Sequence, residues 1–153
     1  MPICVEGDHV RAQEVIQQVK LWDQAIIENS IDDVIHKCAD RISLFDVSSQ
    51  LTGIGVYRKE WEKFSPYFHE NMQITRRDMT VYISEDLAVL HCYSKVDHAE
   101  TTTNQMPWCR TTMCLQKQAG DWLLVHQHIS MPVNVNSGQA ILIKDVPKLK
   151  LVV

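Results

Sequence analysis

The stretch RTTMCLQKQAGDWLLVHQHIS, residues 110–130, decides the fold of this chain. Residues 111–116 and 122–129 are rich in β-branched, aromatic and aliphatic side chains, which is typical of strands. Between them, residues 118–121 include Gly120, which adopts the positive φ of a tight turn at little cost. The pattern therefore predicts a β-hairpin.

The two faces of this hairpin are expected to differ. Because side chains alternate along a strand, one face would carry Trp122, Leu124, His126, His128 and Ser130, and the other Leu123, Val125, Gln127, Ile129 and Met131. Folding about the turn sets Thr112 opposite His126 and Arg110 opposite His128, within about 5.5 Å at Cβ. The sequence thus predicts a polar cluster of Arg110, His126 and His128 on one face and an apolar wall on the other.

The composition is that of an ordinary globular protein. The 153 residues are 45% apolar and 22% charged, which suits one domain spanning 1–153. A net charge of −4 argues against nucleic acid as the main partner, because no basic face could neutralise phosphates. No apolar run approaches the roughly 20 residues of a membrane span, and no secretory signal is visible. The five cysteines never fall in a CxxC spacing, which favours reduced thiols and a cytoplasmic location.

Helical patterns come before the strands. Apolar residues recur at three- and four-residue steps over residues 8–29, and Ser30 resembles an N-cap that opens a second helix to about residue 39. A third, amphipathic helix is expected over residues 56–68.

Most of the remaining chain has strand character. A short strand is expected at 41–47 and long strands at 72–83 and 86–99, followed by the hairpin. The tail, residues 133–153, holds one more possible strand at 140–144. Helices followed by strands form the α+β pattern. A curved antiparallel sheet around the helices would make a cone with a cavity.

Three sequence features resemble the nuclear transport factor 2-like superfamily, in its SnoaL-like and ketosteroid isomerase-like branch. They are the helix pair followed by ADRISLFDV (39–47), the loop 53–55 before YRKEWEKF, and the pattern R-x-T…K-x-x-G-x-W-x-x-x-H-x-H-x-S. The last pattern also resembles the association domain of calcium/calmodulin-dependent kinase II, and is met by Arg110, Thr112, Lys117, Gly120, Trp122, His126, His128 and Ser130. The resemblance covers about residues 8–132.

The resemblance implies a role for Asp46. It matches the proton-abstracting carboxylate of the isomerases, whereas Trp22 matches their oxyanion-hole tyrosine by a gap-free count. An indole N–H donates one hydrogen bond but is a poor substitute for a tuned phenol. The alternative is a strand-end aspartate that is hydrogen-bonded to the following loop.

The other candidate site residues each allow two interpretations. Arg110, His126 and His128 would form an anion or acid–base site, or a polar ladder that either fixes the sheet or lies at a subunit interface. By resemblance to the kinase association domain, pocket positions fall near Met113 and Ile129 on the apolar face. An apolar pocket, or plain core, would be formed by the aromatic residues Trp22, Tyr57, Trp61, Phe64, Phe68 and Tyr93.

No metal or cofactor is expected. A metal at His126 and His128 would need a third ligand from His91, Asp97 or His98, and no spacing rule supports one. The sequence and the resemblance leave two functions open. One is a protein that binds a small hydrophobic ligand, either passively or as an isomerase, cyclase or lyase with Asp46 as base. The other is a non-catalytic homodimeric module with the Arg110–His126–His128 ladder at its interface.

Overall fold

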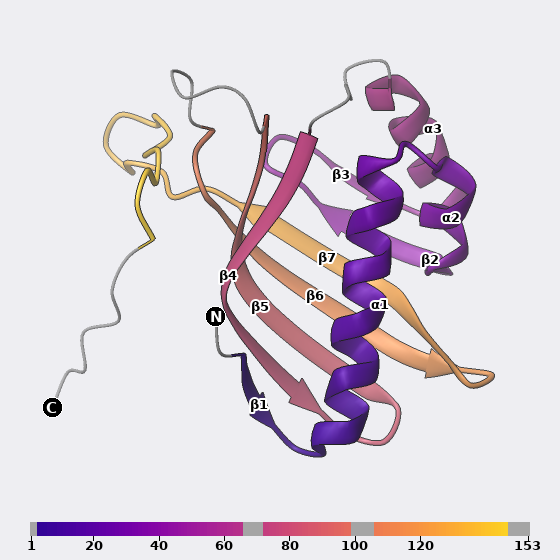
Figure 1. The fold of residues 1–153 in the computed structure, drawn as a ribbon. Helices are drawn as coiled ribbons and strands as arrows, with labels where there is room; N and C mark the ends of the chain where they lie inside the picture. Colours follow the sequence, from indigo (N-terminus) through magenta and orange to yellow (C-terminus); the bar gives the residue numbers. More distant parts are fainter. Residues whose placement is uncertain (1–2, 66–71, 99–105, 147–153) are drawn as a thin grey trace, which may run out of the picture.

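The computed structural model describes residues 3–65, 72–98 and 106–146. In these residues the chain forms three helices and seven strands (Figure 1). In chain order they are β1 (Cys4–Glu6), α1 (His9–Ile27), α2 (Ile31–His36), β2 (Cys38–Phe45), β3 (Gln50–Thr52), α3 (Ile54–Phe64), β4 (Met72–Ile83), β5 (Leu87–His98), β6 (Cys109–Gln118) and β7 (Asp121–Ser130).

The strands form one sheet in the order β1-β4-β5-β6-β7-β2-β3. The sheet is curved and does not close, and α1 lies along its concave face with α2 and α3 beside β2 and β3 (Figure 1). The predicted α+β fold with a curved sheet around the helices is therefore confirmed. The sheet is not wholly antiparallel, since β1 pairs with β4 and β2 pairs with β7 in parallel.

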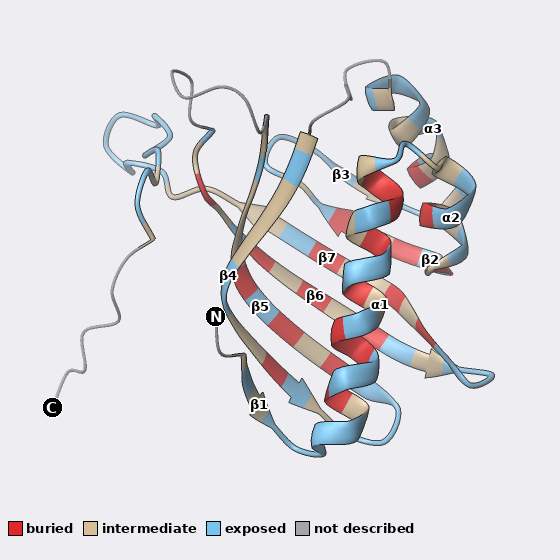
Figure 2. Ribbon diagram, viewed as in Figure 1, coloured by how far each residue is buried: buried red, intermediate tan, exposed pale blue. Residues whose placement is uncertain are grey.

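Helix α1 provides one wall of the core. Its N-cap Asp8 accepts a hydrogen bond from the Arg11 backbone N–H at 2.9 Å, which lowers the pKa of that carboxyl. One face of the helix is buried against the sheet, as the red stripe in Figure 2 shows. The buried residues of this face are Ala12, Val15, Ile16, Val19, Trp22, Ala25 and Ile26. Residues at three- and four-residue steps produce this stripe, as the sequence predicted.

Some element boundaries differ from the prediction. Helix α2 ends at His36, and β2 begins at Cys38, three residues before the predicted strand. The short strands β1 and β3 were not predicted, because three residues carry too little alternation to recognise. In place of a strand at 140–144, the tail forms isolated bridges, with Trp108 pairing to Ile143 and Val133 to Ala140.

A β-bulge in β7 changes the faces of the predicted hairpin. The turn is a two-residue loop of Ala119 (φ 50°) and Gly120 (φ 87°). The residues on either side of the loop, Gln118 and Asp121, pair with each other. Leu115 pairs with Leu124, but Cys114 pairs with His126, so Val125 is the extra residue.

The predicted pairing of Thr112 with His126 and of Arg110 with His128 is therefore wrong. Thr112 pairs with His128, and Arg110 pairs with Ser130. The bulge also divides the predicted polar face. Trp122, Leu124 and Gln127 are all buried on the helix side, whereas His128 is exposed on the other side. Among the described residues, no helix is both long and apolar enough to cross a membrane.

Candidate functional site

A cavity of about 250 Å³ lies between the concave face of the sheet and helices α1 and α3. It is slightly smaller than the usual ligand sites, whose volumes begin at about 300 Å³. Most of its wall is apolar. The hydrophobic and aromatic lining residues are Trp22, Ile26, Leu44, Leu51, Tyr57, Trp61, Phe64, Ile74, Val96 and Ile129, and the polar ones are Asp46, Ser49, Glu60, Arg76, Ser94 and Gln127.

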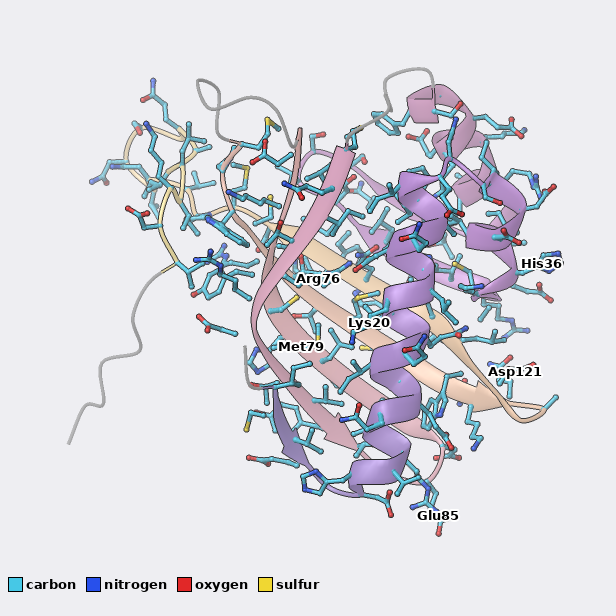
Figure 3. All side chains as sticks on the ribbon, viewed as in Figure 1. Lys20, His36, Arg76, Met79, Glu85 and Asp121 are labelled. Atoms are coloured by element: carbon cyan, nitrogen blue, oxygen red, sulfur yellow. The ribbon has the colours of Figure 1, made fainter. Side chains whose placement is uncertain are left out.

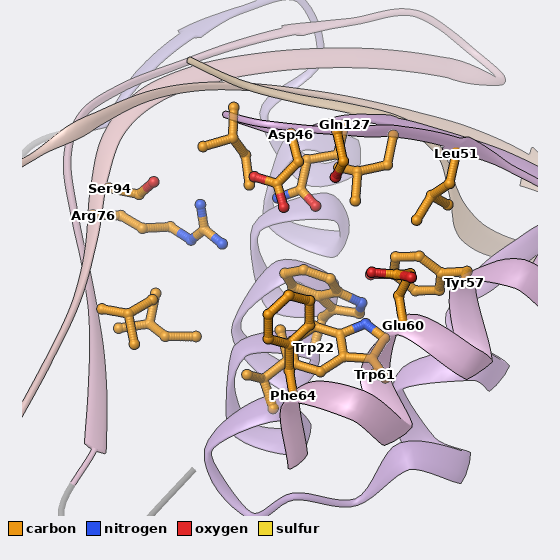
Figure 4. A pocket seen from close by; sticks show the side chains of 16 residues that line it. Trp22, Asp46, Leu51, Tyr57, Glu60, Trp61, Phe64, Arg76, Ser94 and Gln127 are labelled. Atoms are coloured by element: carbon orange, nitrogen blue, oxygen red, sulfur yellow. The ribbon is translucent and has the colours of Figure 1, made fainter. Parts of the chain in front are cut away.

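Asp46 follows the last residue of β2 and begins a tight turn. Its backbone N–H donates to the Ser49 carbonyl at 2.8 Å, and its Oδ1 accepts from the Val47 backbone N–H at 2.7 Å. The carboxylate points into the cavity (Figure 4). Asp46 is therefore both a turn residue, as one interpretation of the sequence expected, and a cavity residue, as the other required.

Two hydrogen-bond donors in the cavity wall lack a partner. The indole Nε1 of Trp22 and the hydroxyl of Tyr57 are buried and make no hydrogen bond in the described structure. Both interact with the Cys38 thiol, but burial raises the pKa of that thiol to about 12, so it stays protonated and is a weak acceptor. Leaving a buried polar group unpaired costs about 1–3 kcal/mol. This cost makes the two donors candidates for ligand contacts.

The phenol of Tyr57 stays neutral in this site. Burial raises the pKa of Tyr57 above its ordinary value, and the nearby Cys38 and Asp46 raise it further. Its ring packs edge-on against Trp61, with the ring centroids 6.2 Å apart. Tyr57 is thus a fixed hydrogen-bond donor rather than an acid that titrates near neutral pH.

An ion pair closes another side of the cavity. Arg76 on β4 lies beside α1 (Figure 3) and donates from Nε and Nη2 to the two carboxylate oxygens of Asp23, at 2.8 and 2.7 Å. Burial alone would lower the pKa of Arg76, but the hydrogen bonds and charge of Asp23 outweigh it and raise that pKa. Arg76 is therefore a permanent cation in the wall of the cavity.

Comparison with known proteins identifies the family. The model of the SnoaL-like domain matches residues 15–134, which is most of the chain. The chain belongs to this family. A search of curated protein sequences found no significant relative of this SnoaL-like domain.

Solved structures agree with this assignment. A nuclear transport factor 2-like protein of unknown function from Pseudomonas putida is 25% identical, with a TM-score of 0.83 over 93% of this chain and 100% of that one. A protein from Shewanella frigidimarina, proposed to be a ketosteroid isomerase, is 20% identical, with a TM-score of 0.62 over 74% and 92% of the two chains. A proposed scytalone dehydratase from Novosphingobium aromaticivorans is 12% identical, with a TM-score of 0.70 over 91% and 96%. The predicted superfamily is confirmed.

The SnoaL-like domain brings most of the predicted pocket residues together. Of the residues assigned to a pocket from the sequence, Trp22, Tyr57, Trp61, Phe64 and Ile129 line the cavity, together with Asp46. Two predicted pocket residues lie elsewhere. Met113 is 1% exposed in the core outside the cavity lining, and Tyr93 pairs with Arg77 and Arg110 without lining the cavity. Phe68 lies outside the described residues.

The predicted cluster of Arg110, His126 and His128 does not line the cavity. It lies on the other face of the sheet, because the bulge at Val125 reverses the direction of the two histidines. Its polar groups have partners there. His126 Nδ1 and Ser43 Oγ are 2.7 Å apart, and Arg110 donates from Nε to Ser130 Oγ at 3.2 Å. These contacts support the structural interpretation of the ladder.

Sequence reasoning missed Arg76 and Gln127. Arg76 is two residues after Ile74 on β4, so alternation alone places both side chains on the helix side of the sheet. This pattern could have identified Arg76 from the sequence. The residue that neutralises it, Asp23, is 53 positions away and carries no local signal. Gln127 was assigned to the apolar wall as its one polar member, and it is 4% exposed.

Proposed function

We propose that this SnoaL-like domain binds a small, mainly apolar carbonyl compound and removes a proton from the carbon next to the carbonyl, without a cofactor. The observation that carries the proposal is the cavity itself. It combines the Asp46 carboxylate with two buried donors, Trp22 Nε1 and Tyr57 Oη, that have no strong acceptor among the described residues. A base and hydrogen-bond donors around an apolar space are the requirements of enolisation.

The carbonyl oxygen of the ligand would accept hydrogen bonds from Trp22 and Tyr57. Asp46 then takes the proton of the adjacent C–H bond, whose electron pair becomes the enolate double bond while negative charge moves onto the oxygen. The two donors stabilise that charge where water is excluded. In a ketone with a β,γ double bond, return of the proton from Asp46 to the γ-carbon gives the conjugated isomer. In a ketone with a β-hydroxyl, that group leaves with the proton that Asp46 holds, as water, and gives an unsaturated ketone.

The names of two structural neighbours agree with this reaction class. One is proposed to be an isomerase of ketosteroids and the other a dehydratase of scytalone. The size of the cavity, about 250 Å³, favours a ligand of one or two rings.

The test is hydrogen exchange at an enolisable carbon. We expect the protein to accelerate deuterium exchange at C1 of 2-tetralone in D₂O, measured by proton NMR against buffer alone. Asp46→Asn should reduce the protein-dependent rate at least about 100-fold, since a positioned base contributes about 10²–10⁴-fold. His128→Ala, outside the cavity, is the matched control and should keep the wild-type rate. Equal rates for wild type and Asp46→Asn would refute the proposal, provided both have the same circular dichroism.

We propose a second role for the opposite face of the sheet, which is association with a second copy of this chain. Phe45 is 49% exposed there and packs edge-on against His126 and His128, with centroids at 4.9 and 5.5 Å. Further exposed apolar area on this face comes from Tyr82 (43%) and Leu87 (46%). Replacing both His126 and His128 with Ala should shift the protein towards monomer in sedimentation, and an unchanged dimer would refute this role.

A further inference from the structure

The Arg76–Asp23 pair has features that a purely structural ion pair does not require. The Arg76 side chain is 10% exposed and that of Asp23 is 16% exposed, so both charges are largely removed from water. A buried ion pair is often no more stabilising than apolar residues of similar volume. This pair also borders the cavity through Arg76 instead of lying within the solid core.

The guanidinium of Arg76 keeps free hydrogen-bonding capacity. Of its five N–H bonds, Asp23 takes one at Nε and one at Nη2, and Nη1 is 3.6 Å from the Cys92 sulfur. Burial raises the pKa of Cys92, so this partner is a neutral thiol and a weak acceptor. The remaining N–H bonds therefore lack a strong acceptor, and Figure 4 shows the guanidinium directed into the cavity.

The charges around the cavity determine which acceptor fits. Arg76 and Asp23 sum to zero, so the pair offers donors without a net positive charge. The other charged residues of the wall, Asp46 and Glu60, are both acidic. A carboxylate ligand would meet net negative surroundings, whereas a neutral hydroxyl or ketone oxygen would accept from Arg76 without that repulsion.

We propose that Arg76 binds a second, neutral oxygen atom of the ligand, at the end away from the carbonyl that Trp22 and Tyr57 hold. In the view of Figure 4, Arg76 and Tyr57 lie on opposite sides of the Asp46 carboxylate. The substrate class is then a one- or two-ring ketone with a hydroxyl or second ketone at its far end. Asp23 is a positioning residue, because it holds the guanidinium towards the cavity and cancels its charge. The inference rests on the proposed function for the orientation of the ligand.

The test is a calorimetric titration of the full chain with three matched probes at pH 7. They are 2-tetralone, 6-hydroxy-2-tetralone and 6-carboxy-2-tetralone. We expect the hydroxy probe to bind about tenfold more tightly than 2-tetralone, because it gains a hydrogen bond from a charged donor. The carboxy probe should bind more weakly than the hydroxy probe. Equal affinities for the hydroxy probe and 2-tetralone would overturn the inference, as would failure of both to bind.

The Asp23→Asn variant separates positioning from a merely structural role. It leaves Arg76 charged but gives the pair a net charge of +1. The affinity for the carboxy probe, relative to the hydroxy probe, should therefore rise at least about tenfold. If the pair only joins α1 to β4, all three affinities will fall together and their ratios will stay constant, which would overturn the positioning role.

A double variant guards against misfolding of Asp23→Asn. Asp23→Asn with Arg76→Gln keeps the net charge at zero and removes the guanidinium. We expect this protein to bind 2-tetralone as the wild type does but to lose its preference for the hydroxy probe. A preserved tenfold preference would overturn the inference.

The two proposals fail in different ways. A wild-type protein that prefers the hydroxy probe but does not accelerate deuterium exchange would support Arg76 as a binding residue and refute Asp46 as a base. Acceleration of exchange without any preference among the probes would support Asp46 and overturn the inference about Arg76.

Discussion

Polar side chains on the two sides of the sheet differ in whether they are hydrogen-bonded. On the helix side, Trp22 and Tyr57 are 5% and 2% exposed, yet the indole N–H and the hydroxyl have no strong acceptor among the described residues. On the other side, His126 and Arg110 are less buried, yet they are hydrogen-bonded to Ser43 and Ser130. The fold alone explains the hydrogen bonds of His126 and Arg110, without any ligand. The buried donors of Trp22 and Tyr57 lower the stability of the fold, so they are the better guide to function.

The largest expected difference between the faces lies in packing. Leu90 on β5 is 0% exposed on the helix side, whereas Leu87 on the same strand is 46% exposed on the other. Leu90→Ala should lower the free energy of unfolding by about 2–5 kcal/mol, because it removes buried methyl groups and leaves a cavity. Leu87→Ala should cost about 1 kcal/mol or less. Urea denaturation measures both, and equal losses would contradict the assignment of the faces.

A smaller change in the free energy of unfolding should have opposite signs on the two sides of the sheet. Tyr57→Phe removes a buried hydroxyl that has no strong acceptor among the described residues, so we expect the ligand-free protein to gain about 1 kcal/mol, towards the lower end of the range for such groups. Ser43→Ala removes the partner of His126 Nδ1 and should lose about 0.5–1.5 kcal/mol. Thermal unfolding of the two variants would test this contrast. A loss of stability in Tyr57→Phe would mean that its hydroxyl is satisfied in solution.

The smallest effect concerns a second indole on the helix side. Trp122 Nε1 donates to Glu14 Oε2 at 3.0 Å, unlike the unpaired indole of Trp22. This hydrogen bond, and then the charge of Lys117, hold the pKa of Glu14 below its ordinary 4.5. A carboxyl whose pKa is lower in the folded state contributes stability above pH 4.5, and that contribution is lost as the pH falls through the lowered value.

Glu14→Gln should therefore remove this pH-dependent contribution. We expect the variant to be less stable than the wild type at neutral pH, by a small margin because Glu14 is exposed, and the difference should shrink as the medium becomes more acidic than pH 4.5. Urea denaturation at a series of pH values measures it. A difference that grows at low pH would contradict the hydrogen bond to Trp122.

The sequence predicted the fold because its main signals are periodic. Spacing of three and four residues gave α1, and alternation gave the long strands β4 to β7. The resemblance then supplied Asp46, which no local pattern distinguishes from other strand-end aspartates. Trp22, Tyr57 and Trp61 were recognisable as a group, since aromatic residues on two helices would meet over one sheet.

The rest depended on contacts that alternation does not encode. Val125 is apolar like its neighbours, so nothing in the sequence marks it as the extra residue of a bulge. For this reason the sequence placed His126 and His128 on the same face as Trp122 and Leu124, which is wrong. Arg76 was missed because a strand arginine is usually exposed, and its burial depends on Asp23 in a distant helix.

The extra residue in β7 also bears on how the chemistry of such a cavity can change. If Val125 took part in strict alternation instead of forming a bulge, His126 and His128 would face the helices, and Gln127 and Ile129 would face outwards. A one-residue shift in the pairing of β7 would thus exchange an amide and an aliphatic side chain for two imidazoles without altering any amino acid. Relatives with the same fold can therefore differ in their reactive groups through the presence or absence of a bulge, a difference that comparison of substitutions alone would overlook.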